Sequence, residues 1–197
     1  MLPAALLTLI LWLPADAAEG TERPCEGDRP KAILGTSGDD VLRGTEGDDV
    51  IYGLAGNDLI YGGGGDDYIC AGDGRDSVYA NGGADRVFGQ HGVNWADGMR
   101  GQDTLVGSLR VDTLVGGRGR DNLFGRNGDD LLLAGPGGDV MLGQSGDDQL
   151  FGYRGNDGLF GWRGNDELDG GSGTNLLDGG VGTDRCANGR PKVNCES

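Results

Sequence analysis

Hydrophobic residues between Gly35 and Ala187 recur with a period of nine, and the polar positions between them keep the same phase. The eighth residue of each nine is Leu, Ile, Val or Met, except at Ala96 and Cys186. One apolar residue between two variable ones predicts a short strand over positions seven to nine, with the eighth side chain facing inward. The register holds for 17 repeats without insertion or deletion, so residues 35–187 are predicted to form one repeat domain.

Glycine and aspartate keep fixed places in the polar part of the repeat. The first residue is Gly except at Ala71, Ala80 and Ala134, and the fourth is Gly except at Arg110. Glycine permits positive φ and close backbone approach, so positions one to six are predicted to form a tight turn. The sixth residue is Asn94 or Asn175 in two repeats and aspartate in the other fifteen: Asp40, Asp49, Asp58, Asp67, Asp76, Asp85, Asp103, Asp112, Asp121, Asp130, Asp139, Asp148, Asp157, Asp166 and Asp184.

This unit resembles the nonapeptide GGxGxDxUx of the RTX (repeats-in-toxin) calcium-binding proteins, and the resemblance covers residues 35–187. With its flanking segments, the chain is similar to small secreted hemolysin-type calcium-binding proteins of actinobacteria. The resemblance implies an all-β fold, a right-handed parallel β-roll (a solenoid) with two repeats per coil and calcium ions between successive turns. The main departure is at the second position, where the family glycine is often replaced, as at Thr36, Leu54, Gln90, Tyr153 and Trp162.

The stacking of coils explains why a cation is needed. Repeats 18 residues apart would lie side by side, which places Asp40 beside Asp58 and Asp49 beside Asp67. Aligned carboxylates repel one another, and Ca²⁺ takes six to eight oxygen ligands of the kind that carboxylates and loop carbonyls supply. Magnesium keeps its waters, and transition metals prefer His or Cys, which do not recur in the loops. The fifteen sixth-position aspartates are therefore the predicted calcium ligands.

Calcium is also expected to drive folding, because the apolar residues are too few to offset the entropy of ordering a glycine-rich chain. We expect the repeats to be largely disordered without calcium. One part of the array is predicted to be weak, since Asn94 and Ala96 share a repeat and Arg110 stands where glycine belongs. The gap between Asn94 and Asp112 should bind calcium poorly. Arg110 either supplies its own charge there or lies in an irregular loop.

Residues 1–18 are predicted to be a secretory signal peptide, because an apolar core over residues 4–13 precedes the small-residue pattern Ala15-Asp16-Ala17. The alternative for this segment is a buried hydrophobic element. Residues 19–34 are expected to form an N-terminal arm or cap, in which Ile33 is in phase with the inward positions. Residues 188–197 are expected to form a C-terminal cap.

The even count of four cysteines in an exported chain indicates two disulfides, for which the sequence allows three connectivities. We favour Cys25–Cys70 and Cys186–Cys195. An arm carrying Cys25 could fold back to the outward-facing Cys70. Facing sheets lie about 10 Å apart, so the tail must tighten to bring Cys195 within disulfide distance of Cys186.

Net charge of −16 and a pI near 4.2 make cations better partners than nucleic acid or anionic membranes. The sequence contains no run of 18 apolar residues, so no transmembrane segment is predicted. The ninth positions of alternate repeats form an apolar stripe, which is expected to pack as a ladder along one sheet; the alternative is a docking or self-association surface. The stripe consists of Tyr52, Cys70, Phe88, Val106, Phe124, Leu142 and Phe160.

The predicted function is that of a secreted, non-enzymatic calcium-binding protein, localised outside the cell. No Ser/His/Asp set, HExxH, phosphate-binding loop or EF-hand signature is found, and His91 is expected to be a solvated loop residue. The alternative is a calcium-dependent adhesive or structural module of a cell surface or matrix. Ice binding is disfavoured, since the third and fifth positions lack a regular array of Thr and Asn.

Overall fold

The protein is described by a computed structural model that covers residues 25, 31–92 and 94–196. The segment predicted to be a signal peptide lies outside the described residues. In the part of the chain described, every regular element is a β-strand, so no helix there is long and apolar enough to cross a membrane. The strands are β1 (Ile33–Leu34), β2 (Val41–Arg43), β3 (Val50–Tyr52), β4 (Leu59–Gly64), β5 (Tyr68–Gly74), β6 (Ser77–Gly82), β7 (Arg86–Gly92), β8 (Trp95–Asp97), β9 (Arg100–Gly101), β10 (Thr104–Val106), β11 (Thr113–Val115), β12 (Arg118–Gly119), β13 (Asn122–Asn127), β14 (Leu131–Gly137), β15 (Val140–Ser145), β16 (Gln149–Gly155), β17 (Gly158–Arg163), β18 (Glu167–Asp169), β19 (Leu176–Val181), β20 (Arg185–Ala187) and β21 (Lys192–Val193).

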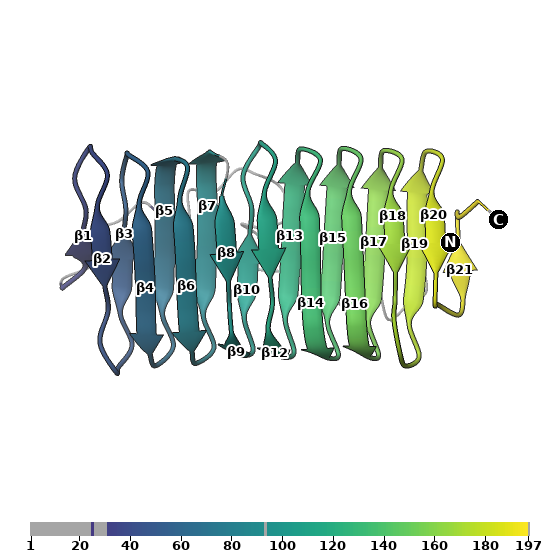
Figure 1. Ribbon diagram of the computed structural model, residues 1–197, viewed down its shortest axis with the longest axis horizontal. Helices are drawn as coiled ribbons and strands as arrows, with labels where there is room; N and C mark the ends of the chain where they lie inside the picture. The colour runs from purple at the N-terminus through teal and green to yellow at the C-terminus, as the bar shows by residue number, and fades with distance from the viewer. Residues whose placement is uncertain (1–24, 26–30, 93, 197) are drawn as a thin grey trace.

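These strands form two parallel sheets that run the length of an elongated stack of coils (Figure 1). One sheet has the order β1-β3-β5-β7-β10-β13-β15-β17-β19-β21, and the other contains β2, β4, β6, β8, β9, β11, β12, β14, β16, β18 and β20. Neighbouring strands are 18 residues apart, as in the pairing of Ile33 with Ile51 and of Leu132 with Leu150. The structure confirms an all-β parallel roll with two nonapeptides per coil.

The eighth-position side chains fill the space between the two sheets and form a single row of buried residues. Ile51, Leu105, Leu123 and Leu150 are 0% exposed, and Ala96 is 3% exposed. A Val, Leu or Ile side chain that leaves water contributes about 1.5–3 kcal/mol, so each coil adds two such contributions. The three alanines that replace glycine at the first position, Ala71, Ala80 and Ala134, face the same core.

The ninth-position apolar stripe forms a second buried cluster, in which the seven side chains pack against one another along one sheet. Tyr68 and Phe88 have ring centroids 5.2 Å apart, and Cys25 and Ala32 also pack on the cluster. Ladder packing along the sheet therefore agrees with the expectation for this row. Cys25 forms a disulfide with Cys70, with Cα atoms 5.9 Å apart.

The two ends of the roll differ from the repeats between them. At the N-terminal end, Ile33 pairs with Ile51 as the expected starting rung. At the C-terminal end the register shortens, because Leu177 pairs with Lys192 instead of a residue 18 positions on. This tightening brings Cys186 and Cys195 to a Cα separation of 5.7 Å, and the two form a disulfide.

Many strands are longer than the three residues that we expected. Strand β4 continues from its inward Ile60 through the first three positions of the next repeat, and β5 continues through four. The reason is that loop backbones of successive coils are hydrogen-bonded as the strands are: the amide of Gly64 donates to the carbonyl of Thr45 (2.8 Å). The unpaired part of each turn is therefore shorter than six residues.

Candidate metal centre

The sixth-position residue of each repeat lies at the edge of the roll, immediately before a strand, and joins its coil to the preceding one. The amide of Asp58 donates to Oδ1 of Asp76 (2.9 Å), and the amide of Asp103 donates to Oδ1 of Asp121 (2.9 Å). Bonds of this kind recur along both edges of the roll, always between residues 18 apart. One carboxylate oxygen of each residue therefore accepts a hydrogen bond from the backbone of the preceding coil.

The other carboxylate oxygen, Oδ2, is buried without a hydrogen-bond partner in twelve loops. A buried acceptor without a donor costs about 1–3 kcal/mol, and more when it is charged. Twelve such oxygens in one small protein indicate that something outside the polypeptide is expected to satisfy them. They belong to Asp58, Asp67, Asp76, Asp85, Asp103, Asp121, Asp130, Asp139, Asp148, Asp157, Asp166 and Asp184.

Several of the unpaired Oδ2 atoms lie close to a backbone carbonyl of the following coil. A Cβ atom built on Gly116 would lie 2.8 Å from Oδ2 of Asp121 and 2.8 Å from the carbonyl oxygen of Ala134. The same convergence occurs at Gly98, beside Asp103. Two acceptor oxygens close to one point repel each other, so the arrangement favours a cation between coils.

Burial makes these carboxyls poor acids in the metal-free chain. Burial raises the pKa of Asp103 and Asp130 to about 8, although the amide of the preceding coil partly opposes the shift and neighbouring carboxylates add to it. Burial likewise raises the pKa of Asp85, Asp139 and Asp148 to about 7. Nearby positive charge would reverse this cost, because a cation stabilises the ionised form.

The donor set available to such a cation is made of oxygens. Among the described residues, no group of three or more His, Cys, Asp or Glu side chains converges on one point. A bound ion would therefore depend on carboxylate oxygens together with backbone carbonyls, which is the ligand set of a hard cation such as Ca²⁺. In this respect the residues present fit calcium.

Five loops differ because the polypeptide itself supplies a donor. In three of them a second-position Thr or Ser contacts Oδ2 of its own aspartate: the amide of Thr36 donates to Asp40 (2.6 Å), and Thr36 Oγ1 lies 3.0 Å from the same oxygen. In the other two loops asparagine replaces aspartate, and the Asn175 amide group donates to the carbonyl of Gly170 (2.6 Å). The five sixth-position residues are Asp40, Asp49, Asp112, Asn94 and Asn175.

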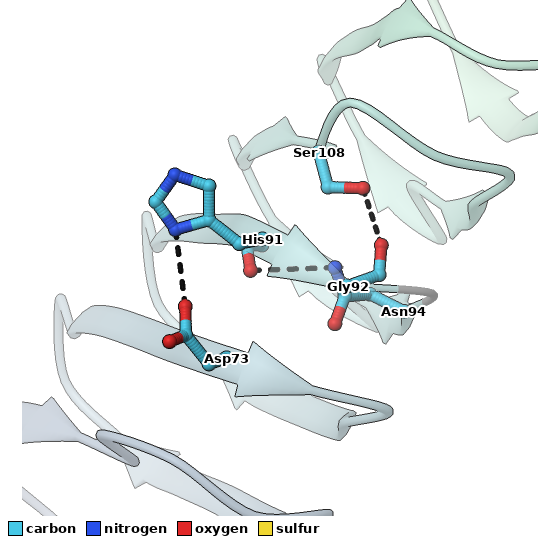
Figure 2. A network of polar contacts seen from close by, with 6 residues as sticks. Asp73, His91, Gly92, Asn94 and Ser108 are labelled. Carbon is cyan, nitrogen blue, oxygen red and sulfur yellow. Dashed lines mark hydrogen bonds and ion pairs between the residues drawn. The ribbon is translucent and has the colours of Figure 1, made fainter.

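The predicted weak part of the array contains two of these loops in succession. Asn94 donates through Nδ2 to its own Gly89 carbonyl (3.3 Å), while its Oδ1 is left without a partner. The next loop along the same edge has Ser108 against Asp112, and the Ser108 hydroxyl also reaches the carbonyl of Gly92 (Figure 2).

Of the two alternatives for Arg110, the structure has the irregular loop. Arg110 and Val111 are exposed and belong to no strand. The charge of Asp112 instead influences the guanidinium of Arg126, whose pKa is lowered mainly by burial, with the Asp112 charge acting in the opposite direction. Arg126 stands at the second position of its repeat, where sequence reasoning assigned no role.

His91 is largely solvated, as expected, with 71% of its side chain exposed, but it lies in strand β7 and not in a loop. It is not isolated, since its Nδ1 lies 3.1 Å from Oδ1 of Asp73, 18 residues earlier (Figure 2). This contact is on the surface, away from the buried sixth-position carboxylates, so His91 takes no part in the candidate metal centre.

The hydroxyl donors Thr36, Thr45 and Ser108 were also missed by sequence reasoning. The second position varies widely, from Gly to Trp, and its few hydroxyl residues do not interrupt the period of nine. The available signal was a Ser or Thr four residues before the aspartate, a spacing that lets a hydroxyl and its own amide reach one carboxylate.

Comparison with known protein families gives a match over nearly all of the roll. The model of the RTX calcium-binding nonapeptide repeat matches residues 34–69, 71–105, 106–141, 133–168 and 163–186. A comparison with curated proteins found no match. Because the matched segments cover most of the chain and coincide with the coils described above, the protein belongs to the RTX calcium-binding nonapeptide repeat family.

Proposed function

We propose that this protein is a calcium-binding scaffold whose ions lie between stacked aspartate loops and complete its fold. The family implies calcium binding. The observation that carries the proposal is the series of buried, unpaired Oδ2 atoms, several of which lie close to a carbonyl of the next coil. In the metal-free chain these oxygens oppose folding, and a divalent cation would turn the same oxygens into ties between coils.

The bound ion supplies charge neutralisation; the chain supplies the rest of the site. Strand pairing at an 18-residue register sets the separation of the aspartates, and the amide of the preceding coil orients each carboxylate through Oδ1. Glycine at the first position leaves room for Oδ2 and the opposite carbonyl, as at Gly116. Folding and binding are therefore expected to be one process, as in other sites that do not exist in the unfolded chain.

A calcium titration followed by both circular dichroism and calorimetry tests this proposal. The protein, first freed of metal by dialysis, is expected to gain most of its β structure on addition of millimolar Ca²⁺, with several ions bound per chain. Full β structure before any calcium is added, unchanged by the titration, would contradict a role for the ion in folding. An absence of heat and of any bound calcium would contradict calcium binding itself.

The aspartates are tested one at a time by a substitution that the chain already contains. Asp121→Asn keeps Oδ1 as the acceptor for the Asp103 amide and places an N–H₂ group where Oδ2 was, as in Asn175. We expect one ion fewer per chain and a higher calcium concentration at the folding midpoint. The matched control is Asp129→Asn at the exposed fifth position, where Oδ1 accepts from Asp147 and no buried oxygen is present. An equal loss in both variants would mean that total charge, and not the sixth position, determines binding.

We propose that the protein acts outside the cell after loss of residues 1–18. Two disulfides among the described residues support an oxidising compartment, where millimolar calcium would also complete folding. Expression of the full chain in an export-competent bacterium, followed by mass spectrometry of the secreted protein, is expected to give an N-terminus near Ala18 or Glu19. Retention of the apolar segment over residues 4–13 in a mature secreted chain would contradict cleavage.

A further inference from the structure

The loops of the roll are either open, with an unpaired Oδ2, or closed by a donor from the polypeptide. The second-position residue distinguishes the loops closed by a hydroxyl from the others. In fourteen repeats that residue has a φ between +62° and +116°, in the left-handed region, whether it is glycine or not. The second-position residues outside this region are the three that carry hydroxyls, Thr36, Thr45 and Ser108. β-Branched Thr is strongly disfavoured at positive φ, so the side chain and the altered backbone occur together.

The altered backbone turns the second-position amide toward the carboxylate. In the loop of Thr45, that amide and Oγ1 lie 2.5 and 2.9 Å from Oδ2 of Asp49, and Oγ1 also accepts from the amide of Gly47 (3.1 Å). The loops of Thr36 and Ser108 have the same set of contacts. In the two Thr loops, an amide and a hydroxyl therefore contact the oxygen that is unpaired in the open loops. In the Ser108 loop the amide donates to that oxygen, and the one hydroxyl proton is shared between Asp112 and the carbonyl of Gly92.

From these contacts we infer that a second-position Ser or Thr makes its loop independent of metal, and that this residue, with the sixth, decides which loops take calcium. The inference rests on the proposed function and refines it. Loops 35–40, 44–49 and 107–112 are closed by a hydroxyl, and those of Asn94 and Asn175 are closed by a side-chain amide. The twelve loops with an unpaired Oδ2 then hold the ions.

The positions of the closed loops give them a structural role. Thr36 and Thr45 lie in the first full coil, which has only the short β1 on its outer side, so a coil that needs no ion begins the roll. The loops of Asn94 and Asp112 are neighbours on one edge, beside strands β8 and β11. These two closed loops divide the open loops of that edge into two groups. On the other edge, the series of open loops is continuous from Asp67 to Asp157.

Opening a closed loop should add an ion. Thr45→Gly changes the loop from GTEGDD to GGEGDD and removes the hydroxyl that contacts Asp49. Calorimetric titration is expected to give one more Ca²⁺ per chain than the wild type. The matched control is Thr45→Ser, which keeps the hydroxyl and should leave the number unchanged.

Closing an open loop should remove an ion. Leu54 is a second-position residue with φ of +77° whose side chain is 50% exposed, so its replacement removes little from the core. Leu54→Thr is expected to shift the loop to the closed form and to lose one Ca²⁺ at Asp58. Leu54→Asn, which tolerates positive φ and carries no hydroxyl, should retain it, as Asn81 has φ of +77° in a loop with an unpaired Oδ2.

The two pairs of variants give outcomes that separate this inference from the proposed function. If the wild type binds calcium and the Thr45 pair and the Leu54 pair each differ by one ion in the stated directions, the inference is supported. Equal stoichiometry within both pairs, with the wild type still binding, overturns the inference and leaves calcium binding intact. A wild type that binds no calcium overturns the proposed function instead. Should Leu54→Thr fail to fold, the Thr45 pair still decides.

Discussion

Several repeats have acids at both the fifth and the sixth position, and the two side chains contact different neighbouring coils. At the fifth position the acid is exposed and accepts from the next coil: the amide of Asn57 donates to Asp39 Oδ1 (2.7 Å). At the sixth position the acid accepts from the previous coil: the amide of Asp40 donates to Asp58 Oδ1 (2.9 Å). The exposed ladder is satisfied by backbone and amide donors alone, so the demand for a cation falls on the sixth position.

Glycine at the fourth position is required by the contact between coils, which gives a test at a single residue. Gly101 has φ of +149°, and a Cβ there would overlap the carbonyl oxygen of Gly83. Gly101→Ala is expected to cost about 1–3 kcal/mol from the backbone alone, measured by urea unfolding in saturating calcium. The control is Gly82→Ala, where a Cβ would have no neighbour within 4 Å and the change should stay within about 0.5 kcal/mol. Equal costs would mean that chain entropy, not the contact, determines the effect.

The period of nine was enough to predict the aspartates and the inward apolar residues, but not the state of each carboxylate. The pattern treats Asp112 and Asp121 alike, although one meets Ser108 and the other has an unpaired oxygen. The difference depends on the second position, whose few Ser and Thr residues do not interrupt the period of nine. The sequence indicated an altered loop only where a residue at one of the fixed positions changes, as at Asn94 and Arg110.

At the scale of one coil, the strands and the loops stabilise the same stacking. The amide of Leu131 donates to the carbonyl of Asp112 (2.9 Å), so the residue that carries the carboxylate also closes the strand ladder. Sequence reasoning placed the strands at the correct phase but made them too short. It assigned hydrogen bonds to positions seven to nine only, whereas open loops such as that of Gly64 continue the ladder.

The inward residue of a coil should matter far more than an apolar residue in its loop. Leu123 is 0% exposed, and Leu123→Ala is expected to destabilise the calcium-loaded roll by about 2–5 kcal/mol. Leu109 is 58% exposed in the loop closed by Ser108, so Leu109→Ala should change stability by less than about 0.5 kcal/mol. Thermal unfolding of both variants in saturating calcium measures the difference. Comparable losses of stability in the two variants would contradict the prediction, because they would mean that Leu109 is packed as tightly as Leu123.

At the scale of the whole molecule, the roll is a one-dimensional stack in which each coil contacts only its neighbours (Figure 1). Stability in such a stack is a sum of coil terms and neighbour terms, so one unfavourable interface is felt locally. The net charge of −16 adds repulsion along the whole length. Neutralisation of the buried carboxylates therefore acts on every interface at once, and protons can supply it as well as calcium.

This equivalence predicts that acid partly replaces calcium. Burial raises the pKa of Asp103 and Asp130 to about 8, whereas an aspartate in an unfolded chain has a pKa near 3.9. Between these values the folded metal-free chain binds more protons than the unfolded chain, so its stability falls as pH rises from about 4 to about 8. Calcium needs the ionised form, so its affinity changes in the opposite direction and weakens as pH falls.

The measurement is circular dichroism of dialysed, metal-free protein from pH 8 to pH 5, alongside calcium titrations at both ends. We expect more β structure at pH 5 than at pH 8 without metal, and a weaker calcium affinity at pH 5. Asp130→Asn should reduce the pH response more than Asp129→Asn, because the first removes a buried carboxyl and the second an exposed one. A metal-free chain that loses β structure on acidification would show that the buried carboxylates do not oppose folding. The proposal that calcium neutralises them between the coils would then be contradicted.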